Sequence, residues 1–200
     1  MIRAGVLSLQ GAVPEHLRAL TRAMEAEGLE GESVTVRESK DLEAIDCLVI
    51  PGGESTTIGK LLHRFNMHEP IRRRAAEGMP ILGTCAGCIL LAKSGDGTLE
   101  KAGIELLGLM DMSVSRNSYG RQKESFEVPL EIDGLVEDFP AIFIRGPEIT
   151  ETWGGCIPLA KLDDTAVMVR QGNLMALTFH PELSDDVRIH RMLLSLVTRT

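Results

Sequence analysis

The sequence predicts a three-layer α/β fold, in which helices cover both faces of an open, mixed and mostly parallel sheet. Short apolar runs alternate with segments of helical period over residues 2–95, which is the pattern of βαβ units. The runs at 46–51 and 79–83 lack polar alternation, as strands do when both of their faces are buried. These two strands are therefore expected at the centre of the sheet, in one domain that spans residues 1–200.

Strands and helices alternate in the first half of the chain. They are expected at 2–9, 46–51 and 79–83 for the strands and at 14–28, 55–65 and 86–95 for the helices. The helix at 55–65 has one apolar stripe suited to packing on a sheet, formed by Ile58, Leu61, Leu62 and Phe65. Ser55 and Thr56 are of the types that cap helix N-termini, so we expect the cap there.

The second half is richer in strands. Four are expected, at 125–132, 141–146, 166–173 and 174–180, and Gly, Pro and Asp turns join them. The last helix is expected to begin near Ser184, because apolar residues recur at helical spacing after it. That stripe consists of Ile189, Met192, Leu193 and Leu196.

Length, charge and composition narrow the classes of function. The chain has 200 residues, 44% of them hydrophobic, and a formal net charge of −8 that is spread along the sequence. Because no basic stripe is present to neutralise phosphates, nucleic acid is not an expected partner. No apolar stretch approaches the roughly 18 residues of a membrane span and no signal segment is evident, so we expect a cytoplasmic protein with free thiols.

Cys85 lies where a buried strand changes into a helix, with Gly83 and Gly87 two residues to either side. This is the nucleophile-elbow pattern, in which glycines make room for a sharp turn that projects the nucleophile above the sheet. A helix N-terminus also stabilises a thiolate. Two other interpretations remain open: a small core residue, which we accept for Cys47 and Cys156, and a redox pair with Cys88 in a C-x-x-C spacing.

His180 and Glu182 supply a base and a group to orient it. Both follow an apolar strand, and Pro181 between them favours an extended chain in which the two side chains point to the same side. A carboxylate there can accept the imidazole N–H and fix its tautomer. The other histidines are expected on polar helix faces or near helix ends, solvated and without a catalytic role: His16, His63, His68 and His190.

Two glycines, Gly52 and Gly53, follow the strand at 46–51 and should lie at the same sheet edge as Cys85. The backbone N–H groups of Gly53 and Ala86 are the candidates for stabilising a tetrahedral oxyanion. Neither a zinc-type cysteine spacing nor an H-E-x-x-H helix occurs, so no metal site is expected.

Three segments in this order give the chain a family resemblance: P-G-G-E-S at 51–55, G-T-C-A-G at 83–87 and H-P-E at 180–182. It resembles the class I (triad) glutamine amidotransferases, whose fold is a flavodoxin-like sheet. Four further segments, at 7–11, 115–122, 143–147 and 169–174, are similar to those of the glutaminase subunits of pyridoxal 5'-phosphate synthase.

The resemblance implies hydrolysis of L-glutamine to L-glutamate and ammonia through a thioester on a Cys-His-Glu triad of Cys85, His180 and Glu182. It implies no cofactor. It further implies that the ammonia passes to the synthase subunit, an obligate protein partner in a large hetero-oligomer. The residues that it assigns to glutamine binding are Gly53, Glu54, Ser55, Arg116, Ile144 and Arg145.

The sequence departs from the family pattern at two positions: Gly146 replaces the usual Ala, which is expected to loosen its loop, and Cys88 replaces a larger apolar residue. From its position after the first strand, Gln10 is a candidate for coupling partner docking to activity. The alternatives that the sequence leaves open are a glutaminase of another biosynthetic pathway, a cysteine hydrolase or peptidase of similar fold, and a non-catalytic redox or binding module.

Overall fold

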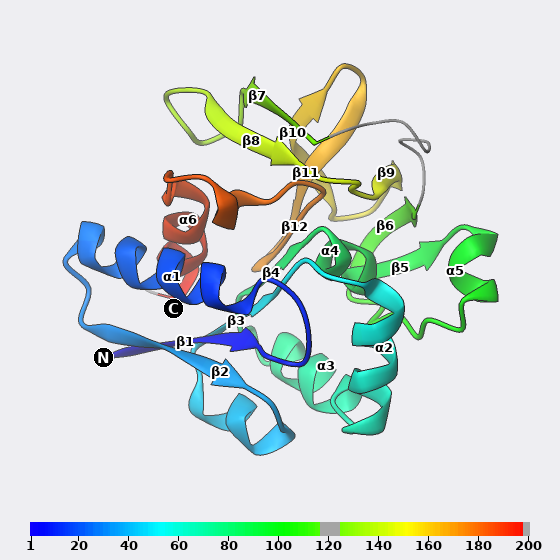
Figure 1. Ribbon diagram of the computed structural model, residues 1–200, viewed down its shortest axis with the longest axis horizontal. Helices are drawn as coiled ribbons and strands as arrows, with labels where there is room; N and C mark the ends of the chain where they lie inside the picture. Colours follow the sequence, from blue (N-terminus) through cyan, green and yellow to red (C-terminus); the bar gives the residue numbers. More distant parts are fainter. Residues whose placement is uncertain (117–124, 198–200) are drawn as a thin grey trace.

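The computed structural model describes residues 1–116 and 125–197, and it confirms the three-layer α/β fold. Among these residues a sheet of ten strands runs through the molecule, with helices on both faces (Figure 1). One half of the sheet is parallel, in the order β2-β1-β3-β4-β12. Its strands are β1 (Ile2–Leu7), β2 (Gly31–Val36), β3 (Cys47–Ile50), β4 (Ile81–Thr84) and β12 (Leu174–Leu177).

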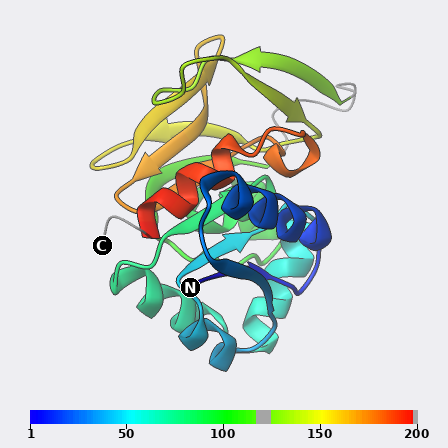
Figure 2. The ribbon, with the colours of Figure 1, turned by 90° about the vertical axis from the view of Figure 1, so that its left-hand side faces the viewer.

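The other half of the sheet is mostly antiparallel and continues from β12 in the order β11-β9-β6-β5, with β10 paired to β11. Its strands are β5 (Ala92–Gly95), β6 (Met110–Ser115), β9 (Glu148–Thr152), β10 (Ile157–Leu162) and β11 (Thr165–Gln171). A separate antiparallel pair consists of β7 (Phe126–Leu130) and β8 (Phe139–Phe143). In Figures 1 and 2, β7, β8 and β10 lie together at the top, away from α3 (His68–Ala76).

Two helices cover one face of the parallel half, α1 (Val13–Glu27) and α6 (Arg188–Val197). Their apolar stripes share one buried cluster with the strands, for example Leu20 and Leu193 with Val6 and Val49. The opposite face is covered by α2 (Ser55–Arg64), α3 and α4 (Ala86–Leu91). Shorter elements complete the chain: α5 (Gly97–Lys101) and the 3₁₀ turns η1 (Ser39–Ala44) and η2 (Pro181–Leu183).

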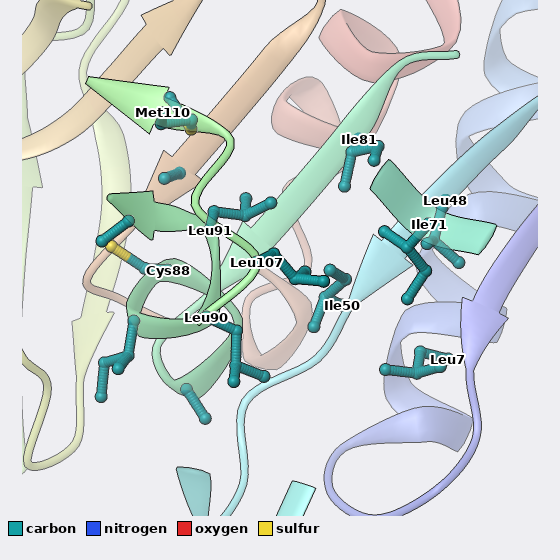
Figure 3. Packing of buried hydrophobic residues seen from close by; sticks show 14 of the residues in the cluster. Leu7, Leu48, Ile50, Ile71, Ile81, Cys88, Leu90, Leu91, Leu107 and Met110 are labelled. Carbon is teal, nitrogen blue, oxygen red and sulfur yellow. The ribbon is translucent and has the colours of Figure 1, made fainter. Parts of the chain in front are cut away.

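The predicted central position of β3 and β4 is confirmed. Along β3, Leu48 and Ile50 belong to the cluster under α2 and α3, whereas Val49 belongs to the cluster under α1 and α6. Figure 3 shows Leu48 and Ile50 among the packed side chains of the first cluster. Both faces of the strand are therefore buried, which explains the absence of polar alternation in the sequence.

Two predicted helix boundaries are wrong. The helix that starts at Ala86 ends at Leu91, and residues 92–95 form β5 because they pair with β6, a partner beyond the reach of local periodicity. The last helix begins at Arg188 rather than near Ser184, because Asp186 accepts the Arg188 N–H at 2.9 Å and terminates an irregular segment after η2. The predictions also omitted β2, α3, β6, β9 and β10.

Candidate active site

Cys85 occupies a strained turn between β4 and α4. Its backbone has φ 50° and ψ −102°, a conformation that residues with a Cβ rarely adopt. The turn is held by the Cys85 N–H, which donates to the Leu177 carbonyl at 2.8 Å. The side chain is 9% exposed, so the sulfur lies in the floor of the site and not on an open surface.

The two glycines around Cys85 are required by contacts with backbone. A Cβ on Gly83 would lie 2.6 Å from the Gly87 carbonyl oxygen, and a Cβ on Gly87 would overlap the Ile50 carbonyl. The start of α4 therefore packs directly on the ends of β3 and β4. The G-T-C-A-G pattern thus gives the nucleophile-elbow geometry that the sequence predicted.

His180 and Glu182 are hydrogen-bonded to each other in a buried position. His180 Nδ1 lies 2.8 Å from Glu182 Oε1, and both side chains are buried. The predicted extended chain is wrong, because Pro181 starts the 3₁₀ turn η2 and the turn, not a strand, brings the two side chains together. The backbone N–H of His180 donates to the Ile142 carbonyl at 2.8 Å, which fixes the backbone of this segment to β8.

Cys85 and His180 meet at Gly52. A Cβ on Gly52 would lie 2.6 Å from His180 Cε1 and 3.2 Å from Cys85 Cβ, so both side chains lie against this glycine. Burial alone would lower the pKa of His180, but hydrogen bonds with Cys85 and Glu182 outweigh burial and raise that pKa above its ordinary value. The contact is suited to a thiolate and imidazolium pair.

The loop of Gly52 and Gly53 is held by three hydrogen bonds. The Gly52 N–H donates to Thr84 Oγ1 at 3.0 Å, the Gly52 carbonyl accepts the Ala12 N–H at 3.0 Å, and the Glu54 N–H donates to Gln10 Oε1 at 2.8 Å. Within residues 1–116 and 125–197, neither the Gly53 nor the Ala86 N–H donates to another group. These two donors remain the candidates for an oxyanion.

Glu54, not Ser55 or Thr56, caps α2. Its carboxylate accepts the N–H groups of Thr56 and Thr57 at 3.2 and 2.6 Å, and it also pairs with Arg116. Burial would raise the pKa of Glu54, but the hydrogen bonds from Thr57 and Thr56 lower it to about 2. The predicted caps, Ser55 and Thr56, are therefore wrong, because the longer Glu54 side chain reaches back to the first N–H groups of the helix.

The remaining predicted glutamine contacts lie around this site. Ser55 is buried at the first position of α2, whereas Ile144 and Arg145 are exposed in the loop after β8. Gly146 is buried there, and a Cβ on it would lie 2.3 Å from the Thr178 carbonyl oxygen, so the backbone packs closely at this position. Part of the segment predicted at 115–122 lies outside the described residues; Arg116 lies within them.

The prediction of solvated histidines is wrong for three of the four. His16, His68 and His190 are buried, and only His63 is exposed. The sequence contained a signal for two of them, because His16 precedes Ala19, Leu20 and Ala23 by three, four and seven residues and so continues the apolar stripe of α1. In the same way His190 precedes Leu193 and Leu194 by three and four.

Because His16 and His190 are buried, we expect the fold to lose stability in mild acid. Burial lowers the pKa of His190 to about 4 and, with the charges of neighbouring histidines, that of His16 well below its ordinary value. An unfolded histidine titrates near 6.5, so between about pH 6.5 and 4 the unfolded chain binds protons that the folded chain does not. The free energy of unfolding should therefore fall as pH decreases through this window, by about 1.4 kcal/mol per pH unit for each neutral histidine.

Urea titrations at pH 7 and pH 5 measure this loss. His190→Gln should lose less free energy of unfolding between these two pH values than the unchanged chain, because one titrating group is removed. His63→Gln, at an exposed histidine, should lose the same amount as the unchanged chain. Identical losses for all three proteins would contradict the expectation.

The three other cysteines are buried and inert. Burial raises the pKa of Cys47 to about 12 and of Cys156 to about 11, and it raises that of Cys88 further. Cys88 is part of α4 and its side chain lies in the core (Figure 3), and all four cysteines are free thiols. This weakens the redox alternative. In the described part of the chain no cluster of three potential metal ligands occurs, and no helix is long and apolar enough to cross a membrane.

The mixed sheet with helices on both faces, and Cys85 close to the hydrogen-bonded His180 and Glu182, fit the class that the sequence resembles, the glutamine amidotransferases. Residues 6–199 match the SNO glutamine amidotransferase family. The chain belongs to this family, which confirms the resemblance found in the sequence.

Its relatives match over nearly their whole length. The pyridoxal 5'-phosphate synthase subunit PdxT of Thermococcus onnurineus is 48% identical over 195 residues, which are 97% of this chain and 98% of that protein. The protein of the same name from Pelotomaculum thermopropionicum is 50% identical over 199 residues, 99% of this chain and 96% of that one.

One solved structure supports the same family, and a second shares the fold. A crystal structure of a glutamine amidotransferase superposes with a TM-score of 0.85 and 43% identity over 98% of both chains. PurLQS from Thermotoga maritima superposes with a TM-score of 0.64 at 17% identity, covering 99% of this chain and 98% of that one, and this likeness concerns the fold alone.

Proposed function

We propose that this chain is the glutaminase subunit of a pyridoxal 5'-phosphate synthase, which hydrolyses L-glutamine and hands the ammonia to a synthase subunit. The observation that carries the proposal is that Cys85 and His180 lie against the same glycine, Gly52, while His180 Nδ1 is 2.8 Å from Glu182 Oε1. The relatives named as subunits of that synthase, which match over nearly their full length, support the pathway.

The chemistry proceeds in two halves. In the first half the Cys85 thiolate attacks the carboxamide carbon of glutamine, and the C–N bond breaks as the His180 imidazolium gives its proton to the leaving nitrogen. Ammonia leaves and a thioester remains. In the second half His180 takes a proton from water, the hydroxide attacks the thioester, and glutamate departs as Cys85 is regenerated. Glu182 stays ionised and holds the imidazole through Nδ1.

The negatively charged oxygen of the tetrahedral intermediate in both halves accepts hydrogen bonds from the backbone N–H groups of Gly53 and Ala86. Support comes from their position in the chain directly after Gly52 and Cys85, which lie against each other, and from the absence of another acceptor for them within residues 1–116 and 125–197. One donor of this kind contributes about 3 to 4 kcal/mol to the stability of the transition state.

The two arginines provide charge for the α-carboxylate of glutamine. Arg116 is held in place by its ion pair with Glu54, and Arg145 is exposed with φ 45° and has no ion pair among the described residues. Ile144, Ser55 and the backbone of Gly53 complete the proposed substrate contacts. The carboxylate of Glu54 already accepts hydrogen bonds from α2 and Arg116, so its part is to place Arg116 as well as to contact substrate.

No cofactor is needed, because nucleophile, base and oxyanion donors all come from this chain. The proposed partner is the synthase subunit, in a large hetero-oligomer that protects the ammonia from loss. A cytoplasmic location is supported by four cysteines that all remain free thiols.

Glutamate release from L-glutamine, measured with and without the synthase subunit, tests this proposal. We expect release with the synthase present, pyridoxal 5'-phosphate as the product of the complete system, and no release from glutamine inside a blocked peptide. Cleavage of the blocked peptide would favour a general cysteine hydrolase. Glutamate release without pyridoxal 5'-phosphate would assign the chain to another pathway.

A further inference from the structure

Behind the proposed triad lies a second group of polar side chains that the mechanism above does not use. His16 Nε2 is 3.4 Å from Glu182 Oε2, the carboxylate oxygen that faces away from His180. The same nitrogen is 3.1 Å from Thr84 Oγ1, and His16 Nδ1 is 3.0 Å from His190 Nε2. The imidazoles of His16 and His190 are fully buried.

The hydrogen-bond partners select the tautomers of the two rings. Among the described residues, Glu182 Oε2 and His190 Nδ1 are buried atoms without a hydrogen-bond partner. If His16 donated from Nδ1, its bare Nε2 would face the carboxylate oxygen, and His190 would bury an unpaired N–H. If His190 donates from Nε2 instead, His16 carries its proton on Nε2, which is 3.1 Å from Thr84 Oγ1 and 3.4 Å from Glu182 Oε2. The second arrangement leaves a bare nitrogen of His190 in the core instead of an unpaired N–H, and it places the His16 N–H, not a lone pair, beside the carboxylate oxygen, so it is favoured.

Thr84 connects this group to the rest of the site. Its hydroxyl oxygen accepts the Gly52 N–H at 3.0 Å, and Thr84 directly precedes Cys85. His16 therefore contacts the orienting carboxylate on one side and, through Thr84, the loop that carries the Gly53 oxyanion donor on the other.

We propose that His16 is a positioning residue, which holds the Glu182 carboxylate toward His180 and ties the Gly52 loop to the nucleophile turn, with His190 fixing its tautomer. This role rests on the proposed glutaminase function. It acts through Glu182 and Thr84, since His16 itself does not reach the substrate.

Charge plays a small part in this arrangement. The titratable groups that surround His16 are His190, His180 and Glu182. Burial, and then the neighbouring histidines, lower the pKa of His16, so the ring is neutral at neutral pH and supplies an N–H dipole. A neutral amide of the right length can replace such a donor.

The test compares His16→Leu, which removes the donor, with His16→Gln, whose amide nitrogen reaches the position of Nε2. With the synthase subunit present, we expect kcat for glutamate release to fall about tenfold or more in His16→Leu with KM changed less than twofold, and to fall less than about threefold in His16→Gln. The rate of Cys85 alkylation by iodoacetamide, followed by mass spectrometry from pH 6 to 9, should move to higher pH only in His16→Leu. His68→Leu, at a buried histidine outside the site, should change neither.

An unchanged kcat in a folded His16→Leu, or equal losses in His16→Leu and His16→Gln, would overturn the proposal. Should His16→Leu fail to fold, His16→Asn, whose amide is too short to reach Glu182, takes its place against His16→Gln. If the unchanged complex releases no glutamate, the proposed function fails, whereas the alkylation profiles still decide whether His16 acts on the cysteine and histidine pair.

Discussion

Replacement of Cys85 by alanine is expected to lower glutamate release by about 10⁴-fold or more, because the sulfur of the proposed nucleophile is removed. The substitution deletes one sulfur from the floor of the site and leaves the glycine contacts of the turn in place. Folding should therefore be retained. The synthase subunit should still make pyridoxal 5'-phosphate when ammonia is added in place of glutamine.

Glutamate release and ammonia-supported synthesis, measured on the same preparation, give the two readouts. Cys88→Ala is the matched control, since Cys88 is buried three residues away and should tolerate loss of its sulfur with glutamate release retained. Glutamate release that survives in Cys85→Ala would refute the nucleophile. A failure of ammonia to support synthesis would refute the division of labour between the two subunits.

Gly52→Ala is expected to reduce kcat for glutamate release by about 100-fold with little loss of stability. The added methyl would lie 2.6 Å from His180 Cε1, and the imidazole is a side chain that can move away. The ring would then leave its place against Cys85. Because the backbone need not shift, the melting temperature should change much less than the rate.

Two further glycine variants serve as controls for this measurement. Gly97→Ala adds a methyl group where no atom lies within 4 Å, so both rate and melting temperature should stay unchanged. Gly87→Ala would place its methyl group against the Ile50 carbonyl, and it should destabilise the whole fold. A Gly52→Ala protein with a normal rate would show that His180 does not need its position beside Gly52.

The parts of the site that local pattern determines could be predicted. The turn at Cys85 is specified by a strand, two glycines and a helix start within five residues, and all of them act on the backbone of the same turn. The pairing of His180 with Glu182 was also predicted, although through an extended chain instead of the 3₁₀ turn that Pro181 starts. In both cases the interacting residues are close in sequence.

The parts that depend on distant partners could not be predicted in the same way. The pairing of His16 with His190 on α6, 174 residues away along the chain, is not contained in the local pattern of α1. Residues 92–95 become a strand because β6 is available to pair with them. The choice of Glu54 as the cap depends on local geometry that a list of preferred residue types does not contain.

The position of β12 has a consequence for synthesis on the ribosome. This strand is made from residues 174–177 but inserts beside β4, directly next to the turn that carries Cys85, whose N–H bonds to Leu177. Until that segment has been translated, the nascent polypeptide keeps an open β-edge in its middle and lacks the imidazole. Under the proposed mechanism, a nascent polypeptide that has not yet reached Glu182 lacks the His–Glu pair and cannot hydrolyse glutamine.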